Sequence, residues 1–169
     1  MWERTITVNG FSKSFSMTGW RMGFACGPKE ILSQMTKIHQ FAIMSAPTTA
    51  QYAAIEALKN GDEDIEKMRS EYDLRRRLVV SSFRRMGFDC FEPEGAFYVF
   101  PCIKNTGLTS DEFCSRLIHE KHVAVVPGTA FNCDTEAPSQ SFRLNYSMPT
   151  DEQIEEGVRI LGQLAKDMI

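Results

Sequence analysis

Hydrophobic positions recur along this chain at two spacings that alternate from segment to segment. A spacing of three or four predicts amphipathic helices, over residues 28–42, 48–58, 62–86, 109–121 and 150–168. Short β-branched or alternating runs predict strands, over residues 5–8, 21–26, 88–91, 96–100, 123–126 and 141–146. Strands that alternate with helices indicate an α/β or α+β fold.

Local signals set the ends of several of these helices. Asp62 can cap the longest one, and Glu63 and Asp64 in its first turn favour the helix dipole. The run Thr109-Ser110-Asp111-Glu112 has the form of a capping box. Three consecutive arginines at 75–77 lie on the long helix, and we interpret them as a solvated or interface face rather than a nucleic-acid site.

The segment after the long helix predicts a strand, a turn and a second strand. Its turn is Pro93-Glu94-Gly95, between aromatic runs at 88–91 and 96–100. Aromatic strands most often fill a core, so we assign no catalytic role to Gly95 or Tyr98. The polar loop from 129 to 140 is long enough to suggest a functional or mobile segment.

Composition excludes several classes of partner. The chain has 169 residues, of which 43% are hydrophobic, and a net charge of −3. This charge gives no basic field for nucleic acid, and no apolar run approaches the roughly 18 residues of a membrane span. Five cysteines without close pairs or metal-ligand spacing indicate reduced thiols in a cytoplasmic protein. His119 and His122 lack further ligands nearby in the sequence, so we expect no metal site.

The most informative stretch for chemistry runs from residue 9 to residue 23. It holds one lysine, Lys13, among glycine, phenylalanine, serine and tryptophan residues, and Arg21 eight positions later. We expect Lys13 to be partly desolvated, which favours the neutral amine that can condense with an aldehyde. The planar fork of Arg21 suits a phosphate. An aldehyde and a phosphate on one cofactor describe pyridoxal phosphate.

This stretch resembles the cofactor-lysine segment of the class I/II aminotransferases, which have the type I pyridoxal phosphate fold. The resemblance implies that Lys13 binds the cofactor aldehyde covalently and that Arg21 binds its phosphate. Some members also use a serine three positions before the lysine. Gly10 stands there in this chain, so Ser12 is the candidate phosphate ligand in its place.

A second candidate residue is Arg143, on the predicted strand 141–146. By alternation alone it would be a solvated strand arginine. However, the run 126–131, Val-Pro-Gly-Thr-Ala-Phe, followed by an arginine strand, resembles the C-terminal signature of the same family. In that signature the arginine binds the α-carboxylate of the substrate, and a guanidinium can do so through two parallel hydrogen bonds.

The resemblance also implies a domain organisation. Full chains of the family are more than twice this long, so the chain corresponds to the C-terminal part of the fold. We expect residues 1–64 to end the large cofactor-binding domain, with two strands left over from its sheet. Residues 65–169 are expected to form a linking helix and a small α+β C-terminal domain. Other parts of the cofactor cradle would precede Met1, so we expect little or no activity from this chain alone and leave its retention of the cofactor open.

Three hypotheses for function follow. The first is a pyridoxal phosphate-dependent aminotransferase of the aspartate, aromatic or N-acetyl-diaminopimelate-like subgroup, acting on an amino acid and a 2-oxo acid and homodimeric at full length. The second is another pyridoxal phosphate enzyme on the same fold, a lyase or synthase. The third is a non-catalytic folded fragment. Amino transfer that depends on a keto acid would separate the first from the second, and cofactor retention would separate both from the third.

Overall fold

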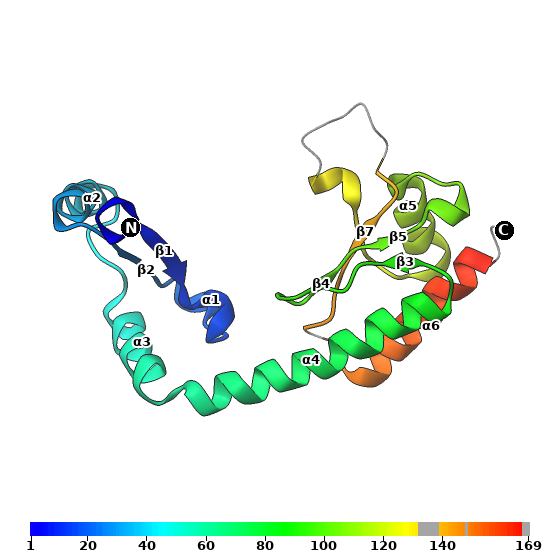
Figure 1. Ribbon diagram of the computed structural model, residues 1–169, viewed down its shortest axis with the longest axis horizontal. Coiled ribbons are helices and arrows are strands. Elements are labelled where there is room, and N and C mark those ends of the chain that lie inside the picture. Colours follow the sequence, from blue (N-terminus) through cyan, green and yellow to red (C-terminus); the bar gives the residue numbers. More distant parts are fainter. Residues whose placement is uncertain (132–138, 148, 167–169) are drawn as a thin grey trace. The chain divides into compact units, whose positions relative to one another are not determined.

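The computed structural model describes residues 1–131, 139–147 and 149–166, with the side chains of 165 and 166 left aside. It divides into two compact units, Met1–Arg69 and Ser70–Ile169, each of which is described by itself (Figure 1). The assignment of residues 1–64 and 65–169 to two domains of a larger enzyme stays a prediction. Among the described residues, no helix combines the length and apolar character needed to cross a membrane.

The first unit contains a two-stranded antiparallel sheet and three α-helices, followed by the first two turns of a fourth. In chain order its elements are η1 (Trp2–Arg4), β1 (Thr7–Gly10), α1 (Phe11–Ser14), η2 (Thr18–Trp20), β2 (Gly23–Cys26), α2 (Lys29–Ala42), α3 (Thr48–Asn60) and the start of α4 (Asp62–Arg85). In the sheet Thr7 pairs with Cys26 and Gly10 with Gly23. A Cβ at Gly23 would lie 3.1 Å from the carbonyl oxygen of Asn9, so this tight pairing favours glycine.

The small core of the first unit lies around Phe11. Phe11, Met17 and Ala54 are buried together, which packs α3 against the loop between β1 and β2. Phe11 also contacts the rings of Phe15 and Phe24, with centroids 5.1 and 5.8 Å away. This core therefore holds in place the loop that carries Lys13.

Helix α2 forms where the sequence predicts a helix, with Pro28 at its N-cap. Its apolar stripe is nevertheless exposed, because Ile31, Met35 and Ile38 are 44%, 37% and 71% accessible. Two short strands present too little surface to cover a helix of 14 residues.

Within its described residues, the second unit contains the remainder of α4, two further α-helices and two small antiparallel sheets. In chain order its elements after α4 are β3 (Asp89–Cys90), β4 (Tyr98–Val99), β5 (Pro101–Cys102), η3 (Lys104–Thr106), α5 (Ser110–Lys121), β6 (Val126–Pro127), η4 (Gly128–Phe131), β7 (Phe142–Asn145) and α6 (Asp151–Lys166). The strand orders are β3-β5 and β4-β7-β6, so β7 is the central strand of the larger sheet.

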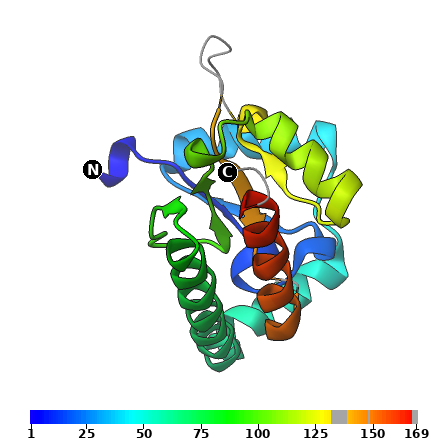
Figure 2. The same ribbon diagram turned by 90° about the vertical axis from the view of Figure 1, so that its right-hand side faces the viewer.

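Helices α4 and α6 lie side by side on this unit (Figure 2). Just beyond the end of α4, the side chain of Met86 lies against α6, where a Cβ at Gly162 would be 2.2 Å from its sulfur. The main core lies between these helices, α5 and the sheets. Its buried residues are Val79, Val80, Phe83, Phe88, Cys90, Val99, Ile103, Phe113, Cys114, Leu117, Phe142, Tyr146, Ile154, Val158, Leu161 and Leu164.

The long helix and the predicted capping box of the second unit are confirmed, but Asp62, predicted to cap α4, is instead its first helical residue. Thr109 and Glu112 form a reciprocal capping box at α5. At α6 the hydroxyl of Thr150 accepts a hydrogen bond from the backbone N–H of Gln153, whose side chain accepts one from the N–H of Thr150. The end of the predicted apolar stripe of this helix, at Met168, lies outside the described residues.

The predicted pairing of strands 88–91 and 96–100 is partly wrong. Asp89 and Cys90 pair with Cys102 and Pro101, beyond the expected second strand. Tyr98 and Val99 pair instead with Asn145 and Leu144 of β7. The Tyr146 backbone N–H and hydroxyl donate to the carbonyls of Phe97 and Ala96, at 3.2 and 3.1 Å, which attaches this segment to β7.

The predicted strand 123–126 is also corrected. Only Val126 and Pro127 form β6, and both are half-buried. The preceding helix ends at His122 in a left-handed conformation, and the backbone N–H of Val123 donates to the carbonyl of Leu117. This helix-terminal hydrogen bond removes Val123 from strand pairing.

The described cysteines Cys26, Cys90, Cys102 and Cys114 are free thiols, and Cys133 lies outside the described residues. Burial raises the pKa of the Cys114 thiol to about 11, and it also raises the pKa of Cys90. Both thiols therefore stay protonated near neutral pH, which makes them poor nucleophiles.

We expect Phe83→Ala to destabilise the second unit strongly, because its ring is fully buried and contacts the rings of Phe88 and Phe142. The loss in the free energy of unfolding should be about 3–5 kcal/mol. Urea unfolding followed by circular dichroism would measure it. Phe91→Ala is the matched control, since Phe91 is 77% exposed, and an equal loss in both variants would contradict this account of the core.

Candidate functional site

Lys13 lies on a single helical turn that follows directly from β1. Gly10, in extended conformation, is the N-cap of α1, and Phe11 directs its ring into the core. The side chain of Lys13 is exposed, which corrects the expectation that it is partly desolvated. At about 100° per residue, Lys13 stands about 200° around the helix from Phe11 and therefore points away from the core.

Ser12 and Arg21 are connected through Thr18. The hydroxyl of Thr18 donates to the carbonyl oxygen of Ser12 at 3.0 Å, and Nη1 of Arg21 donates to the carbonyl of Thr18 at 2.9 Å. Arg21 ends η2 with φ 53° and ψ 47°, in the left-handed region. This conformation costs a non-glycine residue roughly 1–2 kcal/mol, and such strained residues often occur at binding sites.

A pocket of about 380 Å³ lies beside this turn, within the first unit. Its lining residues are Ser16, Thr18, Gly19, Trp20, Arg21, Pro47, Thr49 and Ala50. The guanidinium of Arg21 and three hydroxyl groups line it, and none of the lining residues has a carboxylate; the hydroxyls of Ser16 and Thr18 donate to Sδ of Met68 and to the carbonyl of Ser12. This donor set fits a phosphate group, and Trp20 supplies an aromatic wall. Lys13 and Ser12 are outside the lining and adjoin it through Thr18.

Arg143 lies in the second unit, on the central strand β7. Its neighbours Phe142 and Leu144 turn toward the core, so alternation directs Arg143 to the opposite face. The guanidinium carbon is 4.4 Å from the ring centroid of Tyr98 and 4.5 Å from that of Phe131. Sequence reasoning missed these two contacts, although Phe131 ends the run at 126–131 on which the assignment of Arg143 rests.

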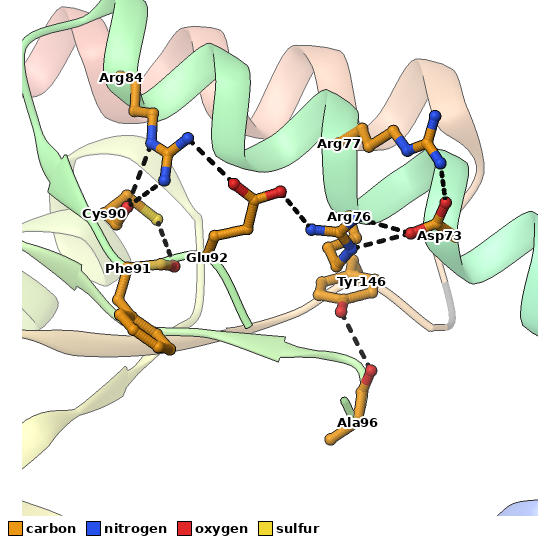
Figure 3. Close-up of polar contacts among 9 residues, drawn as sticks. All are labelled: Asp73, Arg76, Arg77, Arg84, Cys90, Phe91, Glu92, Ala96 and Tyr146. Carbon is orange, nitrogen blue, oxygen red and sulfur yellow. Dashed lines mark hydrogen bonds and ion pairs between the residues drawn. The ribbon is translucent and has the colours of Figure 1, made fainter. Parts of the chain in front are cut away.

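An ion-pair network attaches the segment after β3 to α4 (Figure 3). The carboxylate of Glu92 bridges Nη1 of Arg76 at 2.6 Å and Nη1 of Arg84 at 3.3 Å. Arg84 also donates to the carbonyl oxygen of Cys90, and Asp73 pairs with Arg76 at 2.7 Å. These contacts lower the pKa of Glu92, through hydrogen bonds from Arg76 and Arg84, and that of Asp73, mainly through Arg76.

The three arginines at 75–77, predicted to be a solvated or interface face, divide between solvent and contacts with other segments. The side chains of Arg75 and Arg76 are 14% and 20% exposed, and only that of Arg77, at 67%, is largely in solvent. Arg75 donates to the carbonyl of Ser147 at 3.0 Å and pairs with Asp151 at the start of α6. The first two arginines therefore connect α4 to other segments of the second unit.

We expect the stabilisation from Glu92 to depend on pH. Because its folded pKa is lowered, the contribution is present above the unfolded pKa and is lost as pH falls through the folded value. The difference in unfolding free energy between the wild type and Glu92→Gln should therefore shrink as the pH is lowered from 7 to 3. Urea unfolding across this range would measure it. Glu94→Gln, an exposed carboxylate in the same loop, is the control, and a difference that grew toward acid would contradict the assignment.

Comparisons with known proteins agree on one family. Residues 2–161 match the family described as aminotransferase class I and II. The chain is 48% identical over 166 residues to the putative aminotransferase YugH of Bacillus subtilis, and 46% identical over 169 residues to an aspartate aminotransferase of Pyrococcus abyssi. These alignments cover 98% and 99% of this chain but only 42% of each relative.

A solved structure extends the similarity to the fold. The aromatic aminotransferase from Pyrococcus horikoshii matches with a TM-score of 0.90 and 44% identity, over 99% of this chain and 44% of that one. The mixed helix and strand architecture is therefore that of the C-terminal part of such enzymes. The chain spans less than half the length of these relatives.

Proposed function

Because this chain belongs to the class I and II aminotransferase family, we propose that it carries the cofactor anchor and the substrate arginine of a pyridoxal phosphate-dependent aminotransferase. Lys13 would bind the cofactor covalently, Arg21 and Ser12 would bind its phosphate, and Arg143 would bind the α-carboxylate of the substrate. We also propose that the whole enzyme is a cytoplasmic homodimer that transfers an amino group between an amino acid and a 2-oxo acid. This activity belongs to the proposal because the chain spans only 42% of the length of its relatives.

The observation that supports the proposal best is the pocket around Arg21. A guanidinium and several hydroxyl groups line it without a carboxylate, and Ser12 and Lys13 adjoin it through Thr18. A dianionic phosphate is the small ligand group that such a donor set favours. Lys13 itself is exposed, on the helical turn next to this pocket.

Each residue has a defined role in the proposed reaction. When bound, pyridoxal phosphate supplies an aldehyde and a ring that accepts electrons from the substrate. Nζ of Lys13 would hold this aldehyde, with loss of water, and would act as the general base toward the proton on the substrate Cα. The guanidinium of Arg143 would orient the amino acid by two parallel hydrogen bonds to its carboxylate.

We expect pyridoxal phosphate followed by borohydride reduction to label Lys13 selectively, as mapped by peptide mass. Lys13→Ala should lose the label, and Lys29→Ala, an exposed lysine on α2, should keep it. Arg21→Ala should weaken binding about tenfold to a hundredfold, because a charge-assisted hydrogen bond to the phosphate is lost. Equal labelling of Lys13 and other surface lysines would reject the cofactor site.

We expect the 169-residue chain alone to catalyse little or no transamination. The ring nitrogen of the cofactor needs an acidic partner, and the residues lining the pocket offer no carboxylate for it. A coupled assay with aspartate and 2-oxoglutarate would measure turnover beside a full-length relative. Equal rates would contradict this expectation. Product that forms without any added 2-oxo acid would favour a lyase or synthase on the same fold.

A further inference from the structure

The guanidinium of Arg143 lies between two aromatic rings that come from different segments. Its central carbon is 4.4 Å from the ring centroid of Tyr98 on β4 and 4.5 Å from that of Phe131 at the end of η4. Both distances are within the roughly 6 Å over which a cation and an aromatic face attract each other. Contact with two rings restricts the guanidinium more than contact with either one alone.

The topology of the sheet accounts for the two contacts. Tyr98 pairs with Asn145, two residues from Arg143, so Tyr98 is its diagonal neighbour on the same face. On the other side of β7, Val126 of β6 pairs with Arg143, and η4 follows β6 directly. Strands β4 and β6 flank β7, so the two rings reach Arg143 from segments on opposite sides of its strand.

Phe131 is itself held in place. Its ring packs edge-on against Phe100, with centroids 5.6 Å apart and planes at 82°. At the start of η4 the backbone N–H of Gly128 donates to the carbonyl of Ser141 at 2.8 Å. A Cβ at Gly128 would lie 2.6 Å from that same oxygen, so only glycine permits this approach of η4 to the chain just before β7.

The contacts do not serve to neutralise or bury the arginine. Arg143 stays half-buried, Phe131 is 44% exposed, and no carboxylate among the residues that the structure describes pairs with Arg143. A guanidinium carries its N–H groups in the plane of the fork, at its edge. That edge is the one that donates two parallel hydrogen bonds to a carboxylate.

We propose that Tyr98 and Phe131 are positioning residues, which hold the guanidinium of Arg143 so that its edge receives the carboxylate of the substrate. The inference rests on the proposed function, because it takes Arg143 as the carboxylate-binding residue. An arginine side chain in solvent has many rotamers, and binding a ligand would require it to adopt one of them. Two rings that restrict it beforehand reduce this entropic cost.

The test measures binding of acetate to the isotopically labelled 169-residue chain by NMR. The side-chain Nε–Hε signal of Arg143 is identified by its loss in Arg143→Lys, and the backbone amide signals of β7 report binding in every variant. Sodium acetate is titrated against sodium chloride at constant ionic strength. Phe131→Leu and Tyr98→Leu should each raise the Kd for acetate roughly fivefold and shift the Arg143 signal. Phe131→Tyr and Tyr98→Phe, which keep an aromatic face, should restore wild-type binding. Phe91→Leu, another exposed phenylalanine of this unit, is the matched control.

The outcomes separate this inference from the function on which it rests. The positioning role would be overturned if the leucine variants shifted the Arg143 signal but bound acetate as the wild type does. In that case, loss of acetate binding in Arg143→Lys would still support the role of Arg143 in binding the carboxylate. If Arg143→Lys bound acetate unchanged, both would be overturned. Unfolding temperatures are measured in parallel, and since Phe131 is 44% exposed, Phe131→Leu should unfold at the wild-type temperature.

Discussion

The second unit depends on the burial of Phe142. Its ring stacks on that of Phe113 at 5.4 Å and meets Phe83 edge-on at 6.0 Å, which joins β7 to α5 and α4 in one core. Side chains alternate along a strand, so burying Phe142 directs Arg143 to the opposite face. A slip of one residue in the pairing of β7 would exchange the two, exposing an aromatic ring and burying a charge. The position of the candidate carboxylate-binding residue is thus set by the packing of its neighbour.

In the first unit a buried aromatic residue likewise sets the direction of a nearby polar side chain, here on a helical turn. Phe11 is buried against Met17 and Ala54, and Lys13 follows two positions later, on the far side of α1. In both units a buried aromatic residue close in sequence determines where the polar side chain points. This arrangement lets a reactive or binding group stay accessible while its backbone is held by apolar packing, whose strength does not depend on the protonation state of that group.

The ion pairs of α4 attach a neighbouring segment to this helix and have no role in the proposed reaction. Glu92, Arg76 and Arg84 connect the segment after β3 to the helix, and Tyr146 connects Ala96 and Phe97 to the end of β7. The segment between β3 and Tyr98 is therefore attached to α4 near its start and to the end of β7 near its own end. Because exposed pairs contribute little free energy individually, their main effect is to define the path of a segment that contains few buried residues.

The sequence by itself determined the elements whose signals are local. Periodicity and caps predicted α4, α5 and α6, alternation predicted β7, and the motifs around Lys13 and Arg143 indicated the family. Only the tertiary structure decided which strands pair, that Lys13 is exposed, that Arg75 and Arg76 find partners outside their helix, and that Tyr98 and Phe131 contact Arg143. The physical reason is the separation in sequence over which each interaction acts. A cap or a helical stripe involves residues three or four positions apart, whereas Tyr98 reaches Arg143 only after the chain between them has folded around Phe142.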